Sequence, residues 1–570
     1  MKKILLISTV LAGLVFSSCN KSLDEVPKDF FSPENSFTSK AQFESALSNM
    51  YLRVRSDMYA ATDAVSNYDL MGYDVDFIEN ASAQLTTPYF NWNTLNADNG
   101  VASKWWNRLY RWIFEANTII DRADAPEAKW TSDAEKNAIV AEAKFLRAFA
   151  YHFLGNMYGG VPMVLHETKA PKLDYARTSQ DSVYLQCKSD LEYAVQYMPK
   201  INQLKGGRAP REAAYHLLTE VNIGLKNYDA AIAAASAVID GGNNNLMTAR
   251  FGKWTGFTFS GFTYSGPAKP WGDVYFDLFQ DGNFNYSEGN RETIWNIEQD
   301  PKILGGNNTD VNAAGGFFGM ERWWGTPLAW NATDKNNVAN FLKDTLGGRP
   351  AGGVVSTKYA DSIIWNYKGD FNKDMRNSSF NVQRIFYWTN PASAFYGQPI
   401  TKNNLALPQH TRAYTTPYFL KVVTAVHYHQ FQDSRSKEWH DNGRTYKDWY
   451  IMRLPETYLL RAEAKLAKGD LAGAAIDINA IRNRAKATPV DAGDVNIDLI
   501  LDERARELFA EEFRLNTLMR LGKLNEYLMK YNQWVRDNGH VLDAHINKFP
   551  IPNSEIEANK GARLTQNPGY

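Results

Sequence analysis

The chain has 570 residues, and its 62 lysines and arginines nearly balance its 63 aspartates and glutamates, giving a formal net charge of −1. This balance excludes a polyanion-binding protein, so we expect no nucleic acid among the partners. A mean hydropathy of −0.44 and the lack of a second long apolar run exclude a multi-span membrane protein.

The N-terminus predicts a secretory signal peptide over residues 1–18. A positively charged Met-Lys-Lys start precedes an apolar stretch from Ile4 to Phe16, and two serines precede Cys19. The stretch is shorter than the about 20 residues that a spanning helix needs. Small residues before a cysteine are similar to a bacterial lipobox, in which Cys19 becomes the acylated first residue of the mature chain. An ordinary signal, with Cys19 incidental, is the alternative. Several acyl chains would anchor the protein to a membrane.

Cys187 is the other cysteine of the chain. It shares one helical face with Val183, Tyr184 and Leu191, so we expect a small core residue without a chemical task. With Cys19 acylated, Cys187 would have no partner for an intrachain disulfide. The remaining chain of roughly 550 residues is long enough to bury a large core without one.

The first strong helical patterns lie at residues 104–123 and 131–159. In the second, Ser132 and Glu135 form a capping-box pattern. Apolar residues then recur every three or four positions until Gly159-Gly160 ends the run.

Two later segments repeat one design, at residues 211–242 and 456–485. Each reads as a helix, a short break and a second helix, and the breaks fall at Lys226-Asn227 and Gly469-Asp470. Small residues at Ala231 and Ala474 would let the paired helices approach closely. This arrangement is typical of tetratricopeptide repeats, with a generic helical hairpin as the alternative. We therefore predict an all-α-dominated fold in which such hairpins form a scaffold.

Between the helical regions the amino-acid composition changes. Glycine, asparagine, threonine and aromatic residues dominate residues 251–450, where we expect irregular loops and short strands such as ETIWNIEQ and YFLKVVTAVHYH. Ten of the 16 tryptophans fall in this stretch, which favours loops that recognise a ligand. We divide the mature chain into residues 19–250, the variable loop region 251–450, and residues 451–570.

Two stretches combine flat rings with polar side chains. GGFFGMERWWGTPLAWN holds Arg322, Trp323, Trp324 and Trp330, and TTPYFNWNTLNADNG holds a second set. The candidate residues of the second set are Tyr89, Trp92 and Asn93. Rings can cover the C–H faces of a sugar while amides and guanidinium groups bond its hydroxyls. Adjacent tryptophans cannot share a strand face, so we expect either Trp323 or Trp324 to pack inward. Core packing is the alternative for every tryptophan named.

Acidic residues are numerous in this chain, so we examined whether any of them form a catalytic pair. Glu503, Glu507 and Glu511 recur every four residues on one helix face with arginines between them, a pattern that favours ion pairing over catalysis. The spacing of His427 and His429 matches no established zinc pattern. We find no phosphate loop, dinucleotide fingerprint or nucleophile elbow. We therefore predict no catalytic residue, no metal site and no cofactor.

Several segments resemble the SusD/RagB family of outer-membrane lipoproteins. They include WNRLYRWIFEANTIID, EAKFLRAFAYHFLGNMYGGVPMV, RLPETYLLRAEAKLAKGD, LDERARELFAEEFRLNTLMRLGKL and FPIPNSEIEANKG. The family usually has glycine where Glu512 stands and aspartate where Thr517 stands, which affects local packing. The segment before the WNRLY helix often contributes to the ligand site in relatives.

The resemblance implies a lipoprotein on the outer surface of the outer membrane. Such proteins cap a SusC-like TonB-dependent transporter, bind an oligosaccharide or, in some members, a peptide, and are not enzymes. We expect a glycan ligand because tryptophan is abundant. A peptide ligand and a surface glycoside hydrolase remain the alternatives.

Overall fold

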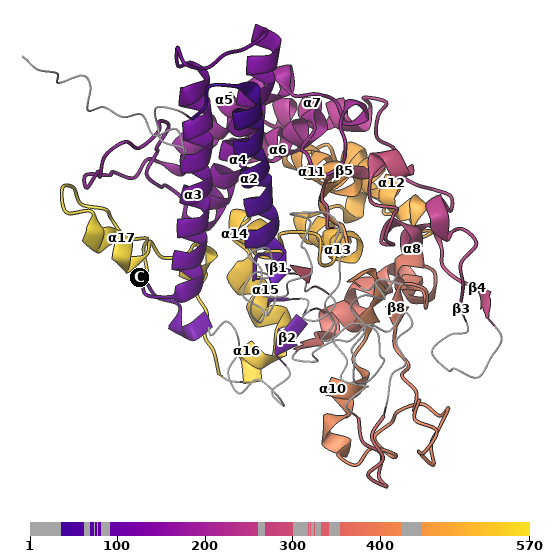
Figure 1. Ribbon diagram of the computed structural model, residues 1–570. Helices are drawn as coiled ribbons and strands as arrows, with labels where there is room; N and C mark the ends of the chain where they lie inside the picture. Colours follow the sequence, from indigo (N-terminus) through magenta and orange to yellow (C-terminus); the bar gives the residue numbers. More distant parts are fainter. Residues whose placement is uncertain are drawn as a thin grey trace, which may run out of the picture.

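The computed structural model describes residues 36–61, 69–72, 75–76, 78–80, 92–259, 268–299, 317–318, 320, 324, 332–340, 354–422, 447–537 and 539–570. The predicted signal peptide, residues 1–18, and Cys19 lie outside these residues. The described part is mostly helical, as predicted, with short strands between the helices (Figure 1).

Helices from both ends of the chain make up the scaffold. The N-terminal ones are α2 (Lys40–Met58), α3 (Gly100–Ala123), α4 (Asp133–Tyr158), α5 (Gln180–Tyr197), α6 (Arg211–Gly224) and α7 (Tyr228–Ile239). Two short helices follow, α8 (Val274–Leu278) and α10 (Thr411–Thr415). The C-terminal ones are α11 (Leu454–Ala467), α12 (Leu471–Arg484), α13 (Ile497–Leu508), α14 (Arg514–Arg520), α15 (Leu524–Tyr531), α16 (Gln533–Asp537) and α17 (Asn553–Ala558).

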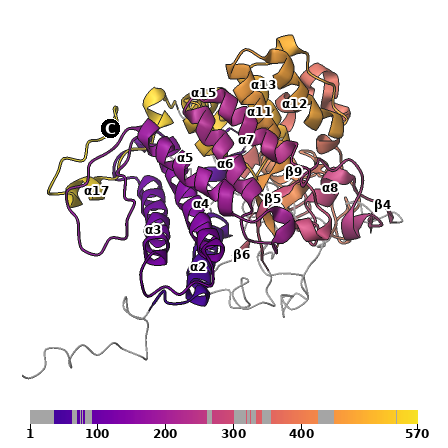
Figure 2. The ribbon, with the colours of Figure 1, turned by 90° about the horizontal axis from the view of Figure 1, so that it is seen from above.

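Consecutive helices pack side by side as hairpins. Each of α3 to α7 contacts the next, and α11 then packs on α7 and pairs with α12. Figure 2 shows this array from above, with α4 between α3 and α5. The C-terminal hairpin therefore extends the N-terminal array, although more than 200 residues separate the two in the sequence.

The predicted hairpin breaks are confirmed. Lys226, between α6 and α7, has a φ of 60°, and Gly469, between α11 and α12, has a φ of 81°. This left-handed backbone reverses the chain and suits glycine, whereas lysine adopts it at some cost. Ala231 and Ala474 are fully buried, as expected for small residues at helix contacts. The Arg461 guanidinium on α11 donates to Ser236 Oγ on α7 over 2.8 Å.

The start of α4 differs in part from its capping-box pattern. Ser132 Oγ accepts from the Glu135 backbone N–H over 3.3 Å, as predicted. The Glu135 carboxylate, however, accepts from the backbone and hydroxyl of Thr131 and not from the Ser132 backbone. The exposed start of the helix lets the longer glutamate chain reach one residue further back.

The strands form five two-stranded antiparallel sheets within the described residues. They are β1 (Ala60–Ala61), β2 (Ile78–Asn80), β3 (Thr258–Phe259), β4 (Lys269–Pro270), β5 (Thr293–Ile297), β6 (Phe317–Phe318), β7 (Val354–Ser356), β8 (Val382–Gln383), β9 (Tyr418–Phe419) and β10 (Trp449–Arg453). The strand predicted in ETIWNIEQ is confirmed as β5, which pairs with β10. The strand predicted from Tyr418 onward is wrong after Phe419, where residues 420–422 form a 3-10 turn, and residues 423–429 lie outside the described part.

Aromatic contacts in the core join the helical array to residues 251–450, which we call the central region. Trp295 on β5 is buried, and its ring lies edge-on to Phe145 and Phe149 of α4, with centroids 5.3 and 5.4 Å away. Cys187 is also buried in this core, as predicted. Burial removes solvation from its thiolate and raises the pKa of the thiol well above its ordinary value.

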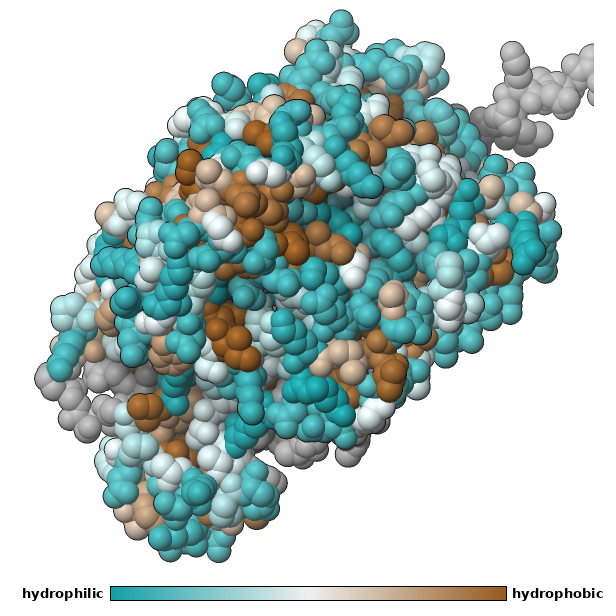
Figure 3. All heavy atoms as spheres, turned by 180° about the vertical axis from the view of Figure 1, so that it is seen from behind, coloured by the Kyte–Doolittle hydropathy of each residue, from teal (hydrophilic) through white to brown (hydrophobic). Residues whose placement is uncertain are grey.

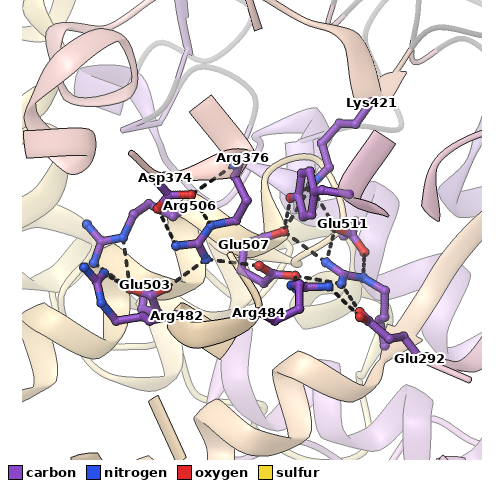
Figure 4. Close-up of polar contacts among 12 residues, drawn as sticks. Glu292, Asp374, Arg376, Lys421, Arg482, Arg484, Glu503, Arg506, Glu507 and Glu511 are labelled. Carbon is purple, nitrogen blue, oxygen red and sulfur yellow. Dashed lines mark hydrogen bonds and ion pairs between the residues drawn. The ribbon is translucent and has the colours of Figure 1, made fainter. Parts of the chain in front are cut away.

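A buried charge network ties the central region to the C-terminal helices (Figure 4). The Arg453 guanidinium, where β10 meets α11, donates to Glu292, Glu507 and Glu511 over 2.7 Å each. These are the glutamates predicted to form ion pairs, joined by Glu292 from the start of β5. One arginine thus joins carboxylates from two distant parts of the chain, the start of β5 and the end of α13.

A second centre of the same network surrounds Glu503 on α13. Its carboxylate accepts from Arg376 and from Arg482 over 2.7 Å each. Arg376 also donates to Asp374 over 2.6 Å. Arg376 lies in the central region and Arg482 near the end of α12. The prediction that the glutamate series serves packing and ion pairing is confirmed for this part of the chain.

We looked for membrane-spanning helices among the described residues. No helix there is both long enough and apolar enough to cross a bilayer. Figure 3 shows that the face opposite Figure 1 is mostly hydrophilic, with hydrophobic residues in separate patches.

Replacing Arg453 by methionine should destabilise the protein strongly. The change leaves three buried carboxylates without their shared guanidinium, which typically costs about 3–5 kcal/mol. Urea unfolding followed by circular dichroism measures the loss. Lys188→Met is the matched control, because within the described part of the chain Lys188 forms only a partly exposed pair with Glu192, worth about 0.3–0.5 kcal/mol. An Arg453→Met variant as stable as this control would contradict the role assigned to the network.

Acid should weaken the same network. Burial would raise the pKa of Glu507, but Arg484, Arg453 and Arg376 outweigh it and lower the pKa to about 2. Between the ordinary glutamate value and about 2, the unfolded chain binds more protons than the folded one, so stability falls as pH falls. Urea unfolding at pH 6, 4 and 3 should show the decrease, and Glu507→Gln should reduce its slope.

Candidate functional site

The predicted ligand residues before α3 separate into buried and exposed positions. Trp92 begins a 3-10 turn, Trp92–Thr94, and its side chain is only 2% exposed. Asn93 in the same turn is exposed. Tyr89 lies outside the described residues. The expectation that the Trp92 ring faces a ligand is corrected, because the side chain is buried in the hydrophobic core.

The second predicted stretch gives a similar result. Trp324 is fully buried, and its ring centroid lies 5.1 Å from that of Phe509. This confirms that one of the two adjacent tryptophans packs inward, and it corrects Trp324 as a ligand residue. Arg322, Trp323 and Trp330 lie outside the described residues.

The described residues offer no grouping of three or more histidine, cysteine, aspartate or glutamate side chains suited to a metal ion. His427 and His429 fall outside them. Glu503, Glu507 and Glu511 are all buried and held by arginine or lysine. Such carboxylates cannot take up a substrate proton without breaking the network.

A pocket of about 360 Å³ lies along the outer side of α3. Its walls come from the middle of α3, from residues 162–175, and from residues 555–564 at the C-terminal end. We call residues 163–176 the strap, because this segment runs between α3 and α17. The volume falls within the range of about 300–1,000 Å³ that is usual for small-molecule sites.

Helix α3 supplies most of the aromatic wall. Asn99 caps the helix by accepting from the Val101 backbone N–H over 2.9 Å. Trp106 and Tyr110 follow at helical spacing, with ring centroids 4.9 Å apart. The Tyr110 hydroxyl donates to the Pro162 carbonyl over 2.7 Å. One turn further on, Phe114 is 45% exposed and lines the same pocket.

The strap is pinned to the C-terminal end by a buried amide. Asn559 Oδ1 accepts from the Tyr175 backbone N–H, and Asn559 Nδ2 donates to the Tyr175 carbonyl, each over 2.8 Å. Arg177, just after the strap, donates to Asn567 Oδ1 over 2.6 Å. These bonds fix Tyr175 as a wall of the pocket, so the pocket exists before any ligand binds.

Glu555 is the one charged side chain among the described residues that line this pocket. Burial raises the pKa of its carboxyl above the ordinary value, while a hydrogen bond with Trp106 acts in the opposite direction. The pocket therefore combines apolar rings with a single partly desolvated carboxyl group. It can bind a compact ligand by ring contact and hydrogen bonds.

Sequence reasoning missed this pocket. Trp106 is buried and the Tyr110 hydroxyl is bonded to Pro162, so both side chains serve the packing of α3. The same two residues also line the pocket, which forms only where the strap and α17 meet α3. No local pattern signals that meeting. The only hint is that the α3 and α17 segments are both among the motifs that carry the family resemblance.

Two family models match the two ends of the chain. The model described as "SusD family" matches residues 366–570, and the model described as "Starch-binding associating with outer membrane" matches residues 23–223. Together they cover most of the chain and leave out most of the central loop region.

Individual proteins agree with these models. Starch-binding protein SusD of Bacteroides thetaiotaomicron is 37% identical over 482 residues, which cover 80% of this chain and 76% of that protein. SusD-like protein P25 of Formosa agariphila is 25% identical, with 96% of each chain covered. Surface glycan-binding protein A from Bacteroides thetaiotaomicron, solved in complex with laminarihexaose, has a TM-score of 0.63 at 19% identity, covering 93% of this chain and all of that one. The fold, the family models and the identity to SusD agree, and the chain belongs to the SusD family.

Proposed function

We propose that the protein is a cell-surface lipoprotein that captures an oligosaccharide and delivers it to a SusC-like TonB-dependent transporter in the outer membrane. Membership of the SusD family is the observation that carries this proposal. It is supported by one relative named for starch binding and by a solved neighbour that holds laminarihexaose.

The anchor in this proposal is Cys19, acylated after removal of residues 1–18. It would hold the protein on the outer membrane with the helical scaffold facing the cell exterior. The balanced charge of the chain suits a neutral polymer better than a polyanion.

Capture without catalysis is the mechanism we favour. The family model names binding, and the buried glutamates of the C-terminal helices serve the charge network. A peptide is the second candidate ligand, and a surface glycoside hydrolase is the least favoured alternative.

The glycan would bind on the aromatic loops, where exposed rings cover sugar faces and amides bond hydroxyls. Tyr89, Asn93, Arg322, Trp323 and Trp330 are the residues we assign to this role. Each ring adds a large contact area and loses little conformational entropy on binding.

Titration of the mature chain, made from Asn20 onward, tests the proposal. The panel contains soluble starch, laminarin, xylan and galactomannan, their hexasaccharides, and peptides of mixed sequence. We expect saturable quenching of tryptophan fluorescence by one glycan class, with the ligand recovered intact. Cleaved ligand would contradict a non-catalytic protein, and a response to peptides alone would move the ligand to the second candidate.

Single tryptophan variants should separate ligand rings from core rings. Trp323→Ala and Trp330→Ala should each weaken glycan binding by up to about tenfold and leave urea stability within about 0.5 kcal/mol of wild type. Trp324→Ala is the matched core variant and should cost about 3–5 kcal/mol of stability. Equal loss of stability in all three variants would assign all three rings to the core.

A further inference from the structure

The pocket between α3, the strap and α17 has polar groups that the fold itself does not use. Asn107 is exposed, and its side chain makes no hydrogen bond to another described residue. The same holds for the Thr168 hydroxyl and the Tyr175 hydroxyl, whereas the Tyr175 backbone is fully engaged by Asn559. An amide and two hydroxyls are therefore available to a ligand at the rim.

The apolar wall beside these groups is equally available. Phe114 remains 45% exposed in the pocket, although large aromatic side chains are usually well buried. Tyr110 lies next to it on the same face of α3, half-buried and held by its bond to Pro162. A flat ring on a rigid helix gives a ligand contact area at little entropic cost.

We propose that this pocket is a second glycan-binding site that takes a neutral pyranose unit of the polymer. This inference rests on the proposed glycan-binding function and assigns a site apart from the aromatic loops. Phe114 and Tyr110 would cover the C–H face of the sugar, and Asn107, Thr168 and Tyr175 would bond its hydroxyls.

The chemistry of the pocket favours a neutral sugar over other ligands. The Glu555 carboxyl accepts hydrogen bonds from sugar hydroxyls when it is ionised and can also donate one when it is protonated, and its charged form repels an acidic sugar. An apolar helix would leave the rim groups of Asn107 and Thr168 without partners, which costs binding energy when they are buried.

A second site changes how the protein holds a polymer. A glycan repeats the same unit, so one chain can occupy both sites, and the second contact then forms at a high effective concentration. Each site alone can be weak while the polymer stays bound. Such avidity also allows release one contact at a time, which suits delivery to a transporter.

The test uses isothermal titration calorimetry on the mature chain with the responding hexasaccharide and polymer of the panel above. Wild type should bind two hexasaccharides, and Phe114→Ala should bind one. Polymer affinity of this variant should fall about tenfold or more. Asn107→Ala removes an exposed amide at the rim of the pocket. It should weaken glycan binding at the second site without lowering the stability of the protein. Leu185→Ala is the matched control, because Leu185 on α5 is exposed and lies outside the pocket.

Hydrogen exchange locates the second site directly. Added hexasaccharide should slow exchange in residues 106–114 and in the strap of wild type, and not in Phe114→Ala. One hexasaccharide per wild-type chain, with unchanged exchange in the strap, would overturn this inference and leave the proposed function standing. Absence of binding to every glycan of the panel would overturn both.

Discussion

The Arg453 guanidinium is the contact on which the rest of the structure depends. It holds Glu292, Glu507 and Glu511 where β10 enters α11. Buried charges are tolerated only with closely matched partners, so this arrangement admits few alternative placements of the chain. The network thus fixes the central loop region against the C-terminal helices. A rigid frame of this kind is what recognition loops require.

The helical array adds a second constraint, because α11 and α12 continue the stack of α3 to α7. The central region is therefore a long insertion between two hairpins that are adjacent in the scaffold. This topology lets the loops vary while the frame stays constant. It also brings the C-terminal end back to α3, where Asn553 on α17 donates its backbone N–H to Ala97 over 2.9 Å. The pocket beside α3 is a product of that return.

Much of the fold could be predicted because its signals are local. Helix periodicity, the break at Gly469 and the ion-pairing face of α13 all depend on residues within a turn or two of one another. The candidate site could be predicted less well. The sequence around a tryptophan in a loop does not show whether its ring is exposed to solvent or packed in the core. Trp92 and Trp324 are packed in the core.

The sequence by itself determined the hairpins, the burial of Cys187 and the family of the chain, because each is written in short patterns of residue type and spacing. Only the tertiary structure decided which arginines hold Glu503 and Glu507, and that the Trp324 ring is buried. It alone created the pocket from α3, the strap and the C-terminal end, whose lining residues Trp106 and Leu564 lie about 460 positions apart. Such contacts depend on how packed helices return to one another, and no local pattern encodes that geometry.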